Sequence, residues 1–165
     1  MQSVRSYIHA QGVACAVINA VLNPAIAWLG NWRMAFVSLS GDNSIVVDTV
    51  ITCTVMSLLV SLFVTPAAQR VFRAGRLTGS DTAFVESGVL AQLPGKAWSF
   101  GLLIGVVAAA VITPLMFATF RALGSDGLSF AGFIILKGSY TAALGFAVTR
   151  WVILRQMVHC RANDE

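Results

Sequence analysis

The chain has 165 residues, of which 57% are hydrophobic and only 11% are charged. A soluble domain of this size has roughly a quarter of its residues charged, because it must present a polar surface to water. The composition therefore excludes an ordinary soluble domain and predicts an all-α integral membrane protein. The net charge of +4 does not indicate a nucleic-acid partner, since the basic residues stand at the ends of apolar runs instead of gathering on one surface.

Four apolar runs are each long enough to cross a bilayer, which takes about 20 helical residues. They predict one membrane domain, 1–165, with four transmembrane helices arranged as two hairpins. The spans are expected near 12–32, 44–64, 98–120 and 129–152. An alternative for the first run is a cleavable signal peptide with an A-x-A site at 25–27, but the run continues past this triplet and contains two asparagines.

The segment 65–97 is the long connection between the hairpins, and we expect short interfacial helices in it. Pro66 stands where a helix can restart at its first turn. A second helix is expected to begin at Ser80 or Asp81 and to end at Leu93. We expect these helices on the inner leaflet, with arginines on lipid phosphates; docking of an anionic substrate or a partner protein is the alternative. The arginines are Arg70, Arg73 and Arg76.

The basic residues predict the direction of the spans, because positive residues are retained in the cytoplasm. Only Arg33 and Arg121 fall on one side of a four-span arrangement, and Lys137 lies within a span. The other side carries Arg5, Arg70, Arg73, Arg76, Lys96, Arg150, Arg155 and Arg161. Both termini and the segment 65–97 are therefore expected in the cytoplasm. The expected location is the plasma membrane, which in a bacterium is the inner membrane.

Small residues at four-residue steps mark helix faces that can pack closely in lipid. The third run carries such a face at Gly101, Gly105 and Ala109. In the first run, Asn19 and Asn23 are four residues apart and therefore lie on one face. Because unpaired amides in hydrocarbon are costly, we expect these two either to bond to neighbouring helices or to line a polar path.

Two prolines indicate helix kinks and a weak internal repeat. Pro24 and Pro114 interrupt helical hydrogen bonding, and their segments, VLNPAIAW at 21–28 and VITPLMFA at 111–118, align with each other. Repeats of two spans each are parallel, so a pseudo-two-fold axis along the membrane normal is expected to relate them. The same alignment places Asp48 beside Lys137.

Asp48 and Lys137 are the acidic and the basic residue inside the predicted spans, and they are expected at one depth. An ionisable group in a span costs about 2.5–3.5 kcal/mol at the bilayer centre, so it usually has a partner and often a role. We therefore predict that the two residues pair. Thr52 and Thr141 extend their faces, and with the two asparagines they form a predicted polar seam. The pair is either a structural clasp or a working site.

Motifs for catalysis, cofactors or metal binding are absent from the sequence, so no enzyme is expected. The histidines lie at span ends, and the three cysteines form neither a disulfide framework nor a metal cluster. Two function classes remain. One is a small permease or ion-coupled transporter with Asp48 and Lys137 as gate or coupling site; the alternative is a non-catalytic accessory or assembly subunit of a larger membrane complex. Four helices barely enclose a pore, so transport calls for a homo-oligomer or a membrane protein partner within the lipid bilayer.

Overall fold

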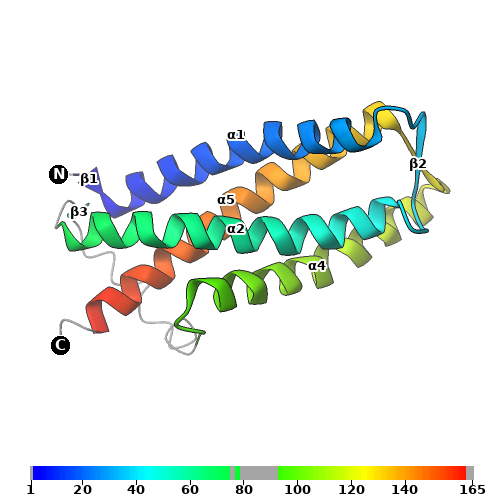
Figure 1. The fold of residues 1–165 in the computed structure, drawn as a ribbon. Helices are drawn as coiled ribbons and strands as arrows, with labels where there is room; N and C mark the ends of the chain where they lie inside the picture. Colours follow the sequence, from blue (N-terminus) through cyan, green and yellow to red (C-terminus); the bar gives the residue numbers. More distant parts are fainter. Residues whose placement is uncertain (1, 75–76, 79–92, 163–165) are drawn as a thin grey trace.

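The computed structural model describes residues 2–74, 77–78 and 93–162, and four helices carry most of them (Figure 1). Each helix is long and apolar enough to cross a membrane, as the sequence predicts for a multi-pass membrane protein. The helices are α1 (Val4–Asn31), α2 (Ile45–Arg73), α4 (Ala97–Ala122) and α5 (Phe130–Ala162). The described residues also form the short strands β1 (Gln2–Ser3), β2 (Phe36–Ser38), β3 (Leu77–Thr78) and β4 (Gly127–Ser129).

The helix α2 is longer than the span predicted for it. The restart predicted at Pro66 is wrong, because α2 continues through Pro66 to Arg73. Tertiary contacts hold this extension: Ala68 is fully buried in a cluster with Tyr7 and Ile153, and Gln69 Nε2 donates to Gln156 Oε1 at 3.1 Å. This packing outweighs the helical hydrogen bond that a proline removes.

The segment expected on the inner leaflet is described in part. Arg70 and Arg73 are exposed in the last turn of α2, where they are free to contact phosphate groups. Arg76 and the helix expected from Ser80 or Asp81 lie outside the described residues.

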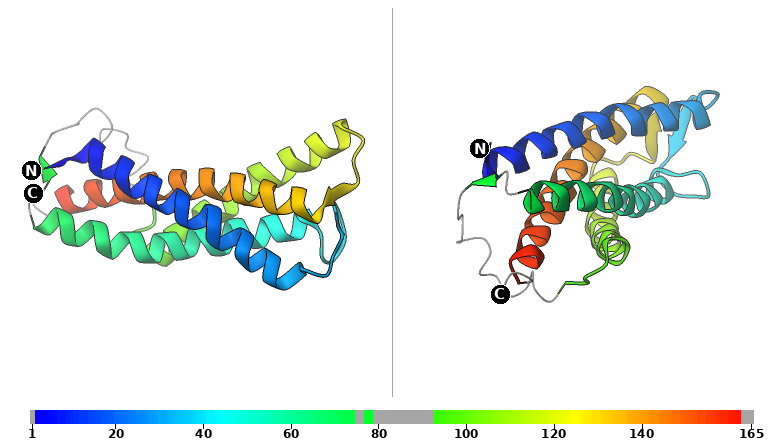
Figure 2. Two further views of the ribbon diagram at one scale, coloured as in Figure 1. Left: turned by 90° about the horizontal axis from the view of Figure 1, so that it is seen from above. Right: turned by 60° about the vertical axis from the view of Figure 1, so that its left-hand side comes forward.

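The helices pack in an order that differs from the sequence order. The extensive contacts join α1 to α5, α2 to α4, and α2 to α5 (Figures 1 and 2). In the described residues, the consecutive helices α1 and α2 make few contacts, and so do α4 and α5. The expected packing as two hairpins is therefore not confirmed. The structure instead consists of an α1–α5 pair and an α2–α4 pair that meet where α2 crosses α5.

The two ends of the bundle differ. At one end, which we call the strand end, β2 and β4 pair as antiparallel strands with Val37 opposite Leu128, and this joins the α1–α2 connection to the α4–α5 connection. The other end, the terminal end, holds both ends of the described chain (Figure 1). There β1 and β3 pair in parallel. These pairings are too short to leave a strand signal in the sequence.

The predicted small face of α4 lies against α2. A Cβ atom added to Gly105 would stand 2.8 Å from the Thr54 Cα, and one added to Gly101 would stand 2.7 Å from the Ser61 Cβ. Ala109 is buried on the same face. Two helices whose backbones come this close leave space only for hydrogen, which is how small residues promote association in lipid. The α2–α4 pair is therefore joined through backbone contact.

The close approach at Gly105 gives a minimal test by Gly105→Ala. The added methyl group meets backbone atoms of α2, which cannot rotate away, so we expect a loss of about 1–3 kcal/mol, typical of overpacking. The matched control is Gly30→Ala, since a Cβ atom at Gly30 has open space around it and alanine favours helix. Thermal unfolding of the purified protein measures both. Equal midpoints would contradict the packing of α4 on α2.

Candidate functional site

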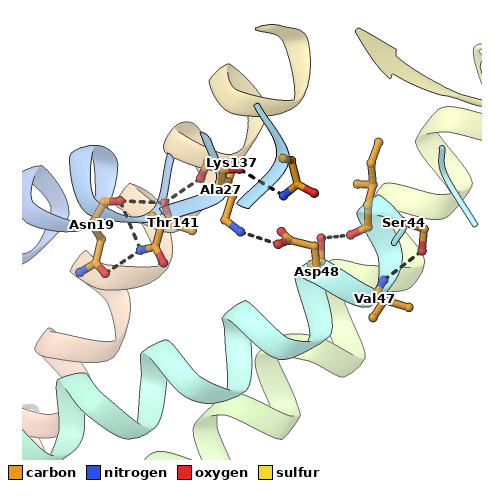
Figure 3. Close-up of polar contacts among 11 residues, drawn as sticks. Asn19, Ala27, Ser44, Val47, Asp48, Lys137 and Thr141 are labelled. Carbon is orange, nitrogen blue, oxygen red and sulfur yellow. Dashed lines mark hydrogen bonds and ion pairs between the residues drawn. The ribbon is translucent and has the colours of Figure 1, made fainter. Parts of the chain in front are cut away.

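Asp48 and Lys137 form an ion pair between α2 and α5 (Figure 3). The Lys137 Nζ donates to the Asp48 Oδ1 at 2.5 Å. The lysine side chain is only 5% exposed, whereas that of the aspartate is 27% exposed. The structure thus brings together the two residues that the sequence places at one depth. The pair also bridges the α1–α5 pair and the α2–α4 pair.

The beginning of α2 positions the aspartate. The Ser44 hydroxyl accepts from the Val47 backbone N–H at 3.3 Å and caps the helix, which places Asp48 in its first turn. The unpaired N–H groups at a helix N-terminus favour a negative charge nearby. The second carboxylate oxygen, Oδ2, is nevertheless buried and has no hydrogen-bond partner among the described residues. One half of this carboxylate is therefore available to a ligand that reaches it.

The environment of the lysine is aromatic on one side and polar on the other. Its Nζ stands 5.7 Å from the centre of the Phe133 ring, a distance at which the ring face attracts a cation. The Thr141 hydroxyl donates to the Lys137 carbonyl at 2.7 Å and also lies 3.1 Å from the Asn19 carbonyl. Thr141 therefore ties the α5 backbone beside the lysine to α1.

The two asparagines bond mainly within their own helix. Asn19 Nδ2 donates to the Cys15 carbonyl at 2.8 Å, and Asn23 Nδ2 donates to Asn19 Oδ1 at 2.9 Å. Asn19 accepts a hydrogen bond from α5 through its backbone carbonyl, and its side-chain amide lies against Gly145. Their amides thus have partners in α1, and the expected seam continues from Lys137 through Thr141 to this group.

Pro24 and Gly138 form a close contact beside the lysine. Both predicted kink residues, Pro24 and Pro114, lie inside continuous helices. Proline lacks the N–H that would bond the carbonyl one turn earlier, here that of Ala20. A Cβ atom at Gly138 would stand 3.2 Å from Pro24 Cγ and 3.3 Å from this carbonyl. The sequence analysis missed Gly138, although a glycine next to a buried lysine is a signal for close helix approach.

Thr52 is buried on α2, and Tyr140 of α5 lies near it. The Tyr140 hydroxyl is buried, and Thr52, Thr49 and the Asp48 carboxylate lie near it. Sequence reasoning missed Tyr140, which lies on the turn that follows Lys137. A second buried polar group therefore accompanies the Asp48 Oδ2.

A cleft of about 160 Å³ opens beside the ion pair at the strand end. We call it the strand-end cleft. Asp48 contributes to its wall, as does the Phe133 ring on which the lysine ammonium lies. The lining residues are Asn31, Val37, Asp42, Asn43, Ser44, Val47, Asp48, Ile51 and Phe133. Amide, hydroxyl and carboxylate groups thus surround a space that reaches one edge of the ion pair. The cleft was not predicted, because its walls come from one connection and three helices.

A second polar group lies toward the terminal end. Arg155, predicted to lie among the cytoplasmic basic residues, turns inward and is fully buried. Its guanidinium donates to the Pro94 carbonyl and stands over the Phe100 ring, 4.5 Å from the ring centre. Its Nε and Nη1 have no partner, and the acidic residues of the described chain, Asp42, Asp48 and Asp126, belong to the other end. Arg155 therefore joins α5 to the beginning of α4.

An apolar cluster separates the two polar groups. It contains Cys53, Met56, Val60, Phe100, Ala109, Leu144, Val148 and Val152. Between the two polar groups, the described helices therefore pack chiefly through apolar side chains. Within the described residues, no three His, Cys, Asp or Glu side chains are grouped to hold a metal ion.

Comparisons with known proteins add no relative to this description: no family model, curated protein or solved structure matches the chain.

The ion pair predicts a strongly non-additive double-mutant cycle. Lys137→Met leaves an uncompensated carboxylate, and Asp48→Asn leaves an uncompensated ammonium; each single change should cost about 3–5 kcal/mol. The double variant removes both charges and should recover most of this loss in thermal unfolding. The matched control is Asp126→Asn, because the Asp126–Arg121 pair is 3.7 Å apart and exposed; it should change stability by at most about 1 kcal/mol. Single losses that simply add would show that the two residues do not interact.

For Arg155 we expect that removal of the charge does not lower stability, in contrast to the single changes at Asp48 and Lys137. Arg155→Met loses a hydrogen bond and the contact with the Phe100 ring, but it also removes a buried charge that has no carboxylate partner among the described residues. Since apolar replacement of buried charges is often neutral or stabilising by about 1–4 kcal/mol, we expect a midpoint at or above that of the wild type. A clear loss of stability in thermal unfolding would show that the guanidinium is needed for folding.

Proposed function

We propose that the protein is a small ion-coupled transporter of the plasma membrane in which Asp48 and Lys137 form the gate and the coupling site. The observation that carries this proposal is the position of the ion pair, buried on its lysine side and bordering a polar cleft on its aspartate side. A purely structural clasp gains nothing from a carboxylate oxygen that has no partner. A site that exchanges binding partners requires a carboxylate oxygen that is free to bind the next one.

The arrangement of the helices supports movement at this gate. Exchanging α1 with α4 and α2 with α5 turns the α1–α5 contact into the α2–α4 contact. The same exchange swaps the paired strands β2 and β4. This correspondence supports a parallel repeat around an axis between α2 and α5. Transporter sites are commonly formed at such repeat interfaces. The ion pair bridges the interface, so its opening would let the two helix pairs rock against each other.

Polar contacts at the terminal end provide a second gate. There Arg155 bonds to Pro94 and Gln156 bonds to Gln69, so α5 is again joined to the α2–α4 pair. With an apolar cluster between the two gates, the protein would work by alternating access and not as an open channel. In this proposal the strand end faces outward and both termini are cytoplasmic. The exposed Arg70 and Arg73 then lie at the inner leaflet.

A homo-oligomer or a partner would cover part of the exposed apolar surface. Only 17% of the apolar window of α1 is buried within the chain, and large side chains such as Val21 and Leu29 face outward. Lipid covers such a surface equally well, so the surface does not favour the alternative of an accessory subunit. We therefore keep transport as the proposed function.

The test is substrate accumulation by the purified protein in sealed vesicles. Vesicles are given an inward proton gradient and a mixture of small metabolites, and the contents are identified by mass spectrometry. Wild-type protein and the control Asp126→Asn should accumulate at least one solute that Asp48→Asn does not. If wild-type vesicles accumulate nothing while the protein copurifies from native membranes with a stoichiometric partner, the accessory role replaces transport.

A further inference from the structure

We propose that the coupling ion is a proton carried by Asp48, and that the transported solute is a small monovalent organic anion that takes the place of Asp48 on Lys137. This inference rests on the proposed function and names its substrate class. It follows from three features of the site: which ion can reach the carboxylate, what its arrival does to the lysine, and what then restores charge balance.

The geometry favours a proton over a metal cation. The lysine ammonium lies 2.5 Å from Asp48 Oδ1 and occupies the place where a sodium ion would bind that oxygen. Sodium would also require several oxygen ligands, whereas a proton needs only a lone pair, and Oδ2 has no partner. The titratable groups around Asp48 are Lys137 and Tyr140 from α5, Cys53 from α2 and Asp42 across the cleft.

Protonation creates a need for an anion. A proton that enters through the strand-end cleft and binds Oδ2 neutralises the carboxylate, so the bond to Lys137 loses its charge. The ammonium is then an isolated positive charge in a buried position, which is strongly unfavourable. An incoming carboxylate carries the same charge as the ionised Asp48 and restores a neutral site. A divalent anion would leave an excess negative charge beside Asp42.

The strand-end cleft has the size and the groups for such a solute. Its volume is about 160 Å³, and Asn31, Asn43 and Ser44 offer amide and hydroxyl groups to a keto or hydroxyl substituent. Phe133 both lines the cleft and lies 5.7 Å from the ammonium, so in this proposal the lysine side chain moves past this ring to meet the anion. When the anion leaves on the other side, Asp48 releases its proton and re-forms the ion pair. One proton and one anion move together, and no net charge crosses the membrane.

The test uses full-length protein in phosphatidylethanolamine–phosphatidylglycerol vesicles that contain a pH-sensitive dye, with pyruvate as the probe. Pyruvate added outside should acidify the lumen faster than in protein-free vesicles. The initial rate should not change when a potassium gradient with valinomycin imposes an inside-negative potential. A rate that depends on this potential would overturn the proposal, and this measurement requires no variant.

Variants separate the proton-carrying role of Asp48 from the anion-binding role of Lys137. Asp48→Asn mimics the protonated carboxylate and leaves Lys137 without its partner, so it should exchange labelled pyruvate across the membrane at a rate independent of pH, without lumenal acidification. Lys137→Met should lose both exchange and acidification. Asp126→Asn, which removes an exposed carboxylate at the same end, should behave as the wild type.

The remaining outcomes distinguish this inference from the proposed function. Pyruvate exchange by Lys137→Met at the wild-type rate would contradict anion binding at the lysine. If wild-type protein ignores pyruvate but accumulates a neutral or cationic metabolite under a proton gradient, the transport function stands and the anion inference fails. If it accumulates no solute under either condition, both fail.

Discussion

The buried ammonium of Lys137 is the constraint on which the arrangement of the bundle depends. A charge in this position needs a partner within contact distance, and the carboxylate of Asp48 is fixed in the first turn of α2 by the Ser44 cap. The pairing therefore sets the height of α5 relative to α2. Since α2 and α5 form the main contact between the two helix pairs, the same ion pair sets how those pairs meet. The β2–β4 pairing then joins the two connections at the strand end, with α2 and α5 at these relative heights.

Sequence reasoning could predict those features that depend on composition and on local pattern. Hydropathy gives the four helices, and the scarcity of charges inside them points to Asp48 and Lys137 as partners. It could not predict which helices pack together, because a small face such as that of Gly105 does not say which neighbour it meets. It also misjudged Pro66, since the local rule for proline is overridden when tertiary contacts hold the helix. It did not foresee that the Arg155 side chain is buried. The strand-end cleft could not be predicted at all, as its walls come from distant segments.

The contacts within each helix pair are closer than the contacts between the two pairs. Within the pairs, backbones touch: Gly105 of α4 meets α2, and Gly138 and Gly145 of α5 meet α1. Such contacts allow little sliding, because each glycine leaves space for one arrangement only. Between the pairs, the contacts are polar side chains at the two ends and an apolar cluster in the middle. Each pair is therefore suited to move as a unit, with side chains at its boundary as the part that changes.

The buried polar groups without partners lie largely on the two helices that form this boundary. The Asp48 Oδ2 belongs to α2, and the Tyr140 hydroxyl and two nitrogens of Arg155 belong to α5. A water or a solute that reaches such a group would gain a hydrogen bond there. An arrangement of the two helix pairs that admits water or a solute to these groups would gain those bonds. A boundary of this kind is what a two-state transporter requires, whereas a subunit that serves only as a rigid support would gain from satisfying every one of these groups.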